Sequence, residues 1–440
     1  MSHLELAASL VVLAAAFRYL NDVALKLPPA VGVMALALAT SLLLGLTGQV
    51  VPGVSERVKA AVGAIDLGQA LLHGMLGFIL FAGAIRINLR ELAARKWTVT
   101  VLATVGVLIS TAVIGLLVWG LLTVLGIPVR PVYCFVFGAL ISPTDPVAVL
   151  AILRRAGVPK ETEVTIVGES LFNDGIGIVV FLGLLGFATS PEETGVFEQA
   201  GLFAWEAVGG VAFGLAGGWA VYRMLRGVDN YQVEILLTFA LVAGGFTLAD
   251  RLHVSGPIAM ATAGLVIGSR ARARAMSEVT GRNLDTVWEL IDETLNAVLF
   301  VLLGLEVLVL RFTGWYVVAG LLSIPIALAA RWISVSLPMA VLRRELPARC
   351  TVRLLTWGGL RGGIAVALAL SLPSEVQGQP VPEKGLLLAL TYTVVVFSIL
   401  IQGLTIGPLA RRWAHQAEDN SPTGDPRAPE LRHSGEECRT

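Results

Sequence analysis

Two carboxylates and an amide stand at the head of an apolar stretch, "GESLFNDGIGIVVF", residues 168–181. Glu169 and Asn173 are four residues apart. Ser170 and Asp174 have the same spacing, so a helix would carry the two pairs side by side on neighbouring faces. Such groups can hold a cation, carry a proton or hydrogen-bond to a neighbouring helix. The spacing therefore predicts one helix with two adjacent polar faces.

Three further charged residues lie inside apolar segments. Asp145 is found in "FGALISPTDPVAVLAI", Arg331 in "IPIALAARWISVSLPM" and Arg361 in "LLTWGGLRGGIAVALAL". A lone charge at the centre of a membrane helix costs about 2.5–3.5 kcal/mol even on the lenient insertion scale. Each of these residues should therefore face a partner or water. The alternative is that polar groups here only join helices to each other.

Two of the apolar segments contain residues that interrupt a helix. Pro143 and Pro146 have no N–H group, so carbonyls near Thr144 lose their helical partners. Glycines at 358, 359, 362 and 363 weaken the helix on both sides of Arg361. Irregular backbone at membrane depth is tolerated where it is buried in protein or lines a water-filled cavity. Close packing of helices through small residues is the alternative for the glycine-rich segment.

The composition indicates what kind of chain positions these residues. Of 440 residues, 55% are hydrophobic and only 15% are charged, whereas about a quarter of a soluble globular protein is charged. We therefore expect an all-α polytopic membrane protein, with the lipid bilayer as its surroundings. The net charge of zero gives no indication of a nucleic-acid partner, and the three distant cysteines form no metal or disulfide pattern. The N-terminus lacks a basic region, so the first apolar run is expected to be retained as a span.

About 13 apolar segments are long enough to cross a bilayer. They lie at 4–20, 28–48, 66–85, 97–125, 131–153, 162–188, 201–225, 231–250, 254–270, 287–310, 313–342, 351–372 and 385–410. Residues 1–412 are thus expected to form one transmembrane domain. Residues 413–440 are polar without apolar periodicity and are expected to form a short disordered cytoplasmic tail.

The basic residues predict the orientation of the spans. Loops that follow odd-numbered segments hold 18 lysines and arginines, and loops that follow even-numbered segments hold six. Because cytoplasmic loops carry the excess of basic residues, we expect the N-terminus outside and the C-terminus in the cytoplasm. The compartment would be the plasma or inner membrane of the cell.

The two interrupted segments are the fifth and the twelfth. If segments 1–6 and 8–13 form two six-helix repeats, each interruption occupies the fifth place of its repeat. Each repeat has an even number of spans and so ends on the side where it began. The single span between the repeats starts the second repeat on the opposite side, so the two repeats are inverted. Matching interrupted segments in inverted repeats are the sequence signature of a transporter site at the membrane midplane.

Three motifs, "SPTDPVAVLAI", "GESLFNDGIGIVVF" and "WGGLRGGIAVALALSLP", occur in this order. In sequence and spacing they resemble the monovalent cation:proton antiporter-1 family, in particular its prokaryotic NhaP-type sodium/proton antiporters. The resemblance covers about residues 4–412. It implies the NhaA-like antiporter fold, in which the two discontinuous helices cross, and a homodimer whose protomers each have a core domain and an interface domain. It also implies a transporter of monovalent cations and protons that is not an enzyme and needs no cofactor.

The resemblance also implies roles for Ser170 and Asp174, which share one polar face of the helix, and for residues of the proline-broken segment. Asp174 matches the aspartate that carries either the sodium ion or the proton. Ser170, Thr144 and Asp145 match positions that surround the cation. Sodium is a hard cation that prefers oxygen ligands, which these residues can supply. A proton would compete with sodium for the Asp174 carboxylate.

Glu169 and Asn173, which share the other polar face of the helix, are implied to be structural. Glu169 matches an acid that, together with Asn173, pairs with an arginine on the eleventh span, where Arg331 stands. Arg361 matches the arginine beside the second broken helix. Asn173 cannot titrate, and this favours electroneutral one-for-one exchange. The chain departs from some members at Ala82, near which they carry a glutamate, so the resemblance assigns no ion contact to that helix.

Alternative functions remain open on sequence grounds. Potassium/proton or broad-range antiport fits the same oxygen ligands. An intramembrane aspartyl protease would use Asp145 and Asp174 as a dyad that shares a proton, but the expected "GxGD" motif is absent. An ion channel is a third possibility.

Overall fold

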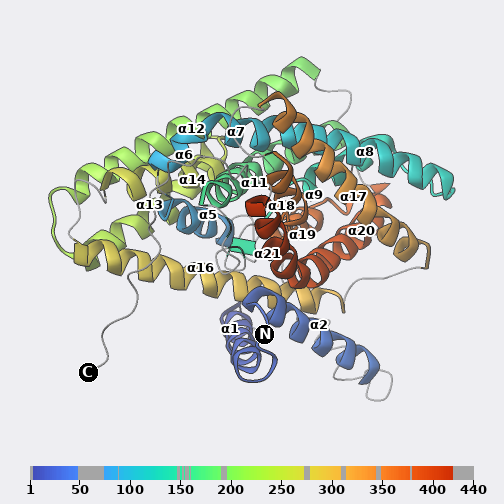
Figure 1. The fold of residues 1–440 in the computed structure, drawn as a ribbon. Helices are drawn as coiled ribbons and strands as arrows, with labels where there is room; N and C mark the ends of the chain where they lie inside the picture. The colour runs from blue at the N-terminus through green and yellow to red at the C-terminus, as the bar shows by residue number, and fades with distance from the viewer. Residues whose placement is uncertain are drawn as a thin grey trace.

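The computed structural model describes residues 3–47, 74–87, 89–145, 149–150, 153, 158, 160–189, 196–271, 278–308, 314–342, 348–376 and 379–419. Within these ranges the chain is a bundle of helices with one small antiparallel ribbon (Figure 1), which pairs β1 (Glu375–Val376) with β2 (Gln379–Pro380). The first half contains α1 (His3–Leu20), η1 (Asn21–Leu25), α2 (Pro29–Thr47), α5 (Leu76–Ile85), α6 (Leu89–Ala94), α7 (Lys96–Val101), η3 (Leu102–Gly106), α8 (Val107–Val124), α9 (Pro131–Ile141) and α11 (Lys160–Thr189). The second half contains α12 (Val196–Leu225), α13 (Tyr231–Arg251), α14 (Gly256–Val266), η4 (Ile267–Ala271), α16 (Glu278–Glu306), α17 (Gly314–Val341), α18 (Ala348–Trp357), α19 (Gly363–Leu370), α20 (Glu383–Phe397), η5 (Ser398–Gln402) and α21 (Gly403–Asp419).

Each of the 13 apolar segments contains helix. Eight helices among the described residues are long and apolar enough to cross a membrane, and three shorter apolar helices, α5, α9 and α14, accompany them. Large apolar side chains such as Trp205, Leu236 and Val341 are exposed on the outside of the bundle, which is where a bilayer would contact it. The expectation of an all-α, multi-pass membrane protein is therefore confirmed.

Two predicted boundaries are wrong. The tenth segment was expected from residue 287, but α16 begins at Glu278. Its first turns are rich in charge, yet Leu284 and Trp288 are spaced for one helix face and are both buried. At the C-terminus, α21 continues beyond residue 412 to Asp419, so the first seven residues of the predicted tail are helical. Residues 420–440 lie outside the described part of the chain.

The two interrupted segments cross each other. α9 ends at Ile141, and α18 and α19 are separated by residues 358–362. The N–H of Asp145 donates to the carbonyl of Leu360 at 2.8 Å, in an isolated antiparallel bridge. The predicted crossing of two discontinuous helices is therefore present, and backbone hydrogen bonding joins them at the crossing.

The buried apolar side chains form two clusters, and the larger includes the broken segments. The larger joins side chains of α1, α2, α9, α11, α17, α19 and α20. The smaller joins α5, α12, α13, α14 and α16 around Trp288. The Trp288 ring packs on Phe81 at 4.6 Å and on Phe239 at 5.1 Å between ring centroids, and its Nε1 donates to Thr238 at 3.1 Å. These contacts fix α5 against α16, the two helices that face α11 across the site.

Candidate functional site

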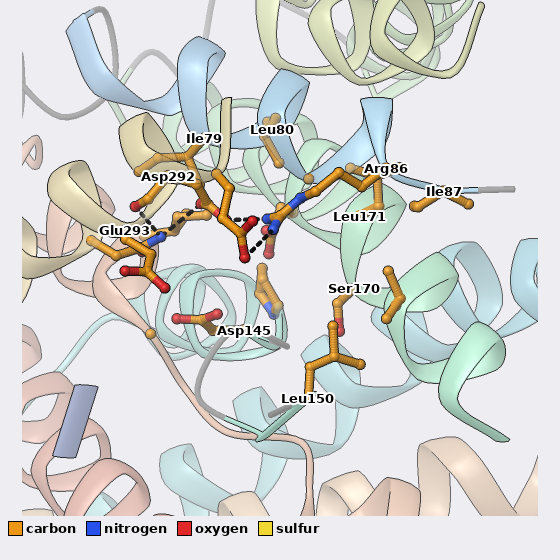
Figure 2. A pocket seen from close by; sticks show the side chains of 18 of the residues that line it. Ile79, Leu80, Arg86, Ile87, Asp145, Leu150, Ser170, Leu171, Asp292 and Glu293 are labelled. Carbon is orange, nitrogen blue, oxygen red and sulfur yellow. Dashed lines mark hydrogen bonds and ion pairs between the residues drawn. The ribbon is translucent and has the colours of Figure 1, made fainter. Parts of the chain in front are cut away.

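A cavity of about 660 Å³ lies between α5, α11, α16, α19 and the segment that follows α9. Asp145, Ser170 and Asp174 all line it. In Figure 2, Asp145 and Ser170 lie on one side of the cavity, and Asp292 lies on the other. The structure thus brings three of the four residues assigned to the ion to one cavity.

The four polar residues of the two predicted faces of α11 are all buried in the protein. Glu169, Ser170 and Asn173 are at most 2% exposed, and Asp174 is 6% exposed. α11 runs without interruption from Lys160 to Thr189, so its backbone is satisfied internally and only its side chains need partners. Both of the polar faces predicted from spacing are therefore buried against other helices.

Thr144 links the broken segment to α11. Its hydroxyl lies 3.1 Å from the Ser170 hydroxyl and accepts a hydrogen bond from the Asn173 amide at 2.8 Å. Its backbone N–H donates to Oδ1 of the Asn173 side chain at 3.4 Å. Asn173 was expected to join Glu169 at Arg331, and this is not what the structure has. The side chain turns to the broken segment because Thr144 offers both a donor and an acceptor there.

Glu169 and Arg331 form a bidentate ion pair. Arg331 donates through Nη1 to Oε1 and through Nη2 to Oε2, the latter at 2.8 Å. Its Nε donates to the carbonyl of Leu355 at 3.1 Å. A Cβ at Gly359 would stand 2.6 Å from that Nε, so the glycine leaves room for the guanidinium. The pair joins α11, α17 and α18 and neutralises two buried charges.

Arg361 donates hydrogen bonds to backbone carbonyls of the proline-broken segment that have no helical N–H partner. Pro146 has no N–H to return to the Ser142 carbonyl four residues earlier. Arg361 Nη1 donates to that carbonyl at 2.6 Å and to the Pro143 carbonyl at 3.0 Å. Its own backbone N–H donates to the Ser398 hydroxyl at 2.8 Å. The glycine-broken segment therefore supplies the donors that the proline-broken segment lacks.

Asp145 lies against the second broken segment. A Cβ at Gly362 would stand 2.6 Å from Asp145 Oδ2, so only glycine allows this approach. Asp145 is partly exposed, whereas Asp174 is buried. The two carboxylates face the same cavity from different elements.

α5 contributes no carboxylate to the cavity wall. Ala82 is fully buried and belongs to the apolar cluster around Trp288. The residues of α5 that line the cavity are Ile79, Leu80 and Gly83. Over the residues that the structure describes, no group of three or more His, Cys, Asp or Glu side chains is arranged to hold a metal ion.

The sequence reasoning missed a set of lining residues on α16 and the arginine that follows α5. Arg86 lines the cavity together with Asp285, Glu289, Asp292, Glu293 and Asn296. A sequence signal was available, because residues 285, 289 and 293 are spaced for one helix face, as are 292 and 296. Residue 285 lies before position 287, where the apolar segment begins, so hydropathy alone leaves it outside the predicted helix.

We expect the Glu169→Gln variant to lose stability strongly. The substitution leaves the Arg331 guanidinium buried without a counter-charge, which costs about 3–5 kcal/mol. The measurement is thermal unfolding in detergent, followed by size-exclusion chromatography. Glu161→Gln is the matched control, because Glu161 pairs with Arg95 near the start of the same helix with its side chain 63% exposed, and such pairs contribute at most about 1 kcal/mol. Equal melting temperatures for the two variants would contradict a bracing role.

We expect Arg361→Met to destabilise the crossing. Two buried carbonyls lose their donor, at about 1–3 kcal/mol for each unsatisfied group. Arg361→Lys keeps the charge and can reach one carbonyl, so its melting temperature should fall between those of wild type and Arg361→Met. Arg353→Met, at an exposed position on α18, should melt like wild type. If Arg361→Met also melted like wild type, Arg361 would not be needed to satisfy the broken helix.

Comparisons with known proteins agree with this architecture. Residues 7–412 match the family model "Sodium/hydrogen exchanger, transmembrane". The chain is 49% identical over 416 residues to the Na(+)/H(+) antiporter NhaP of Pseudomonas aeruginosa, covering 93% of this chain and 96% of that protein. It is 34% identical over 379 residues to the Na(+)/H(+) antiporter NhaH of Halobacillus dabanensis, covering 84% and 89% of the two chains.

A solved structure has the same fold. It is the sodium proton antiporter MjNhaP1 from Methanocaldococcus jannaschii at pH 8, with a TM-score of 0.72 at 21% sequence identity, covering 93% of this chain and 99% of that chain. The match of the family model to nearly the whole membrane region, and the high identity to relatives over most of their length, lead to one conclusion. The chain belongs to the sodium/hydrogen exchanger family.

Proposed function

We propose that this chain is a secondary antiporter that exchanges sodium or lithium ions for protons across the membrane. The observation that carries the proposal is the burial of the Asp174 carboxylate at a cavity that Asp145 and Ser170 also line. One carboxylate at such a site can hold either a cation or a proton, but the bound cation opposes protonation. Competition for Asp174 then couples the two fluxes.

The cation ligands are oxygen atoms from two elements. Asp174 and Ser170 stand one turn apart on α11, and the hydroxyl of Ser170 is held by Thr144. The Thr144 backbone carbonyl and the Asp145 carboxylate, directly or through water, complete a set of hard oxygen ligands. This set also accepts potassium, so potassium/proton or broad-range exchange is the alternative on the same scaffold.

The stoichiometry follows from the neutral groups around Asp174. Asn173 carries no charge and is engaged with Thr144. Glu169 is neutralised by Arg331 in a buried pair. Within the buried stretch 168–181 of α11, Asp174 is then the one carboxylate left to load and unload. It carries one positive charge in either direction, which makes the proposed exchange electroneutral and one-for-one.

Alternating access requires the cavity to open to one side at a time. The cavity includes Lys160 at the start of α11 and Arg86 after α5. By the distribution of basic residues these positions are cytoplasmic, so the described state faces inward. The N-terminus is then outside, the C-terminus is in the cytoplasm, and the chain resides in the inner or plasma membrane as a homodimer whose core moves against an interface domain.

Membership of a transporter family argues against the aspartyl protease alternative. A channel differs from an antiporter in its kinetics. Exchange through Asp174 saturates with sodium concentration and carries no net current, whereas channel flux gives current without saturation.

We expect Asp174→Asn to abolish sodium-driven proton movement. The amide can neither release a proton nor balance a cation, so both half-reactions are lost. The measurement is the pH change inside proteoliposomes after a sodium pulse, reported by a trapped dye. Asp22→Asn, at an exposed position, is the control and should exchange like wild type. Exchange by Asp174→Asn at the wild-type rate would show that another group is the carrier.

Ion selectivity and charge balance are tested in the same vesicles. We expect sodium and lithium pulses to drive proton movement, and potassium to drive little. Collapsing the membrane potential with valinomycin and potassium on both sides should leave the initial rate unchanged, because one charge moves each way. A larger response to potassium than to sodium would favour the potassium/proton alternative. A rate that changed with the potential would contradict one-for-one exchange.

A further inference from the structure

The cavity has an acidic wall on α16. We call Asp285, Glu289, Asp292 and Glu293 the acidic row, and all four line the same cavity as Asp174. Clefts lined by one sign of charge concentrate ions of the opposite sign. Two basic residues also line the cavity, Lys160 and Arg86. Of these, Arg86 extends across the cavity toward the acidic row (Figure 2).

Arg86 is held by contacts on both sides. It directly follows the end of α5, and its Nε donates to the carbonyl of Ala82 at 3.2 Å. Its Nη2 forms an ion pair with Asp292 Oδ2, and its Nη1 lies 3.9 Å from Glu289 Oε1. Asn296 donates to the other carboxylate oxygen, Asp292 Oδ1, at 2.8 Å. The two Asp292 oxygens are therefore directed to two different partners.

This pair contributes little to holding α5 and α16 together. The Asp292 side chain is 7% exposed, but the Arg86 side chain is 35% exposed, and water at the guanidinium weakens the contribution of the pair to stability. The two helices are already packed through Phe81 and Trp288 at 4.6 Å between ring centroids, one turn before Asp292. A role in the cavity explains the pair better than a role in packing.

The charges of Arg86 and Asp292 affect how easily a cation reaches Asp174 through the cavity. A guanidinium without a counter-charge in this cavity would repel cations on their way to Asp174. Asp292 places a negative charge directly on it and directs it to α16. With Arg86 neutralised, the other acidic residues of the lining outnumber the one other basic residue, Lys160, so an incoming cation meets a negative potential.

We propose that the Arg86–Asp292 pair sets the electrostatic potential of the cavity, and with it the sodium concentration at which exchange is half-maximal. Asp292 acts as a positioning residue, which neutralises Arg86 and keeps its guanidinium away from the cation path. Neither residue binds the transported ion. This inference rests on the proposed function, because it requires cations to reach Asp174 through this cavity.

The test is the apparent KM for sodium in proteoliposomes. Asp292→Asn exposes the charge of Arg86, and we expect a rise in KM of about fivefold or more, with kcat within about twofold of wild type. Arg86→Gln leaves the acidic row uncompensated and should lower KM. The double variant removes both charges and should return KM to within about twofold of wild type. Glu161→Gln, which breaks the Arg95 pair outside the cavity lining, should leave KM unchanged.

Salt separates an electrostatic effect from a structural one. Adding impermeant choline chloride shortens the range of the field, so the KM difference between Asp292→Asn and wild type should shrink as choline rises. A purely structural pair predicts instead that both single variants change KM in the same direction, that the double variant is not rescued and that salt has no effect. Any of these results, or unchanged KM in both single variants, would overturn the inference.

The outcomes distinguish this inference from the proposed function. If Asp174→Asn abolishes exchange while Arg86→Gln and Asp292→Asn keep the wild-type KM, only the inference fails. If Asp174→Asn still exchanges, the carrier assignment fails whatever the other variants do. Arg86→Gln provides the decisive measurement if Asp292→Asn does not yield folded protein, because it removes the exposed member of the pair.

Discussion

The site depends on a backbone constraint. Two helices are broken inside the membrane region, where the lipid offers no hydrogen bonds, so each freed N–H and carbonyl needs a partner from the protein or from water in the cavity. The Asp145 N–H donates to Leu360, and the Arg361 guanidinium donates to the carbonyls of Ser142 and Pro143. The two interruptions therefore satisfy each other, and neither would be stable alone. This mutual satisfaction places Thr144 and Asp145 beside Ser170 and Asp174 of α11.

Much of this arrangement was predictable from the sequence. The 13 apolar segments, the two interruptions and the two polar faces of α11 follow from hydropathy, from proline and glycine chemistry and from helical spacing. Spacing on one helix does not predict the partner on another, which is why Asn173 was expected at Arg331 and is found at Thr144. The start of α16 was missed because a hydropathy criterion excludes charged turns, although Leu284 and Trp288 bury one face of them. The contact between Arg86 and Asp292 spans 206 positions of sequence, and no local pattern encodes it.

The packing of α5 decides which of its residues face the cavity. Ala82 is turned into the apolar cluster with Trp288, and Gly83 and Arg86 are turned toward the cavity. Arg86, which directly follows α5, therefore contributes a positive charge to a site whose other charged walls are largely acidic. A carboxylate on α5 would add another negative charge near Asp174 and Asp145.

Two arginine–carboxylate pairs flank the site, and burial separates their roles. The Glu169–Arg331 pair has almost no access to water, so losing one partner strands a buried charge, and the pair fixes the structure. The Arg86–Asp292 pair lies at the cavity, with the Asp292 side chain 7% exposed but the Arg86 side chain 35% exposed. Water weakens its contribution to stability, but its charges still act on ions in that cavity. The same chemical pair is therefore a brace where water is excluded and a determinant of ion concentration where water is admitted.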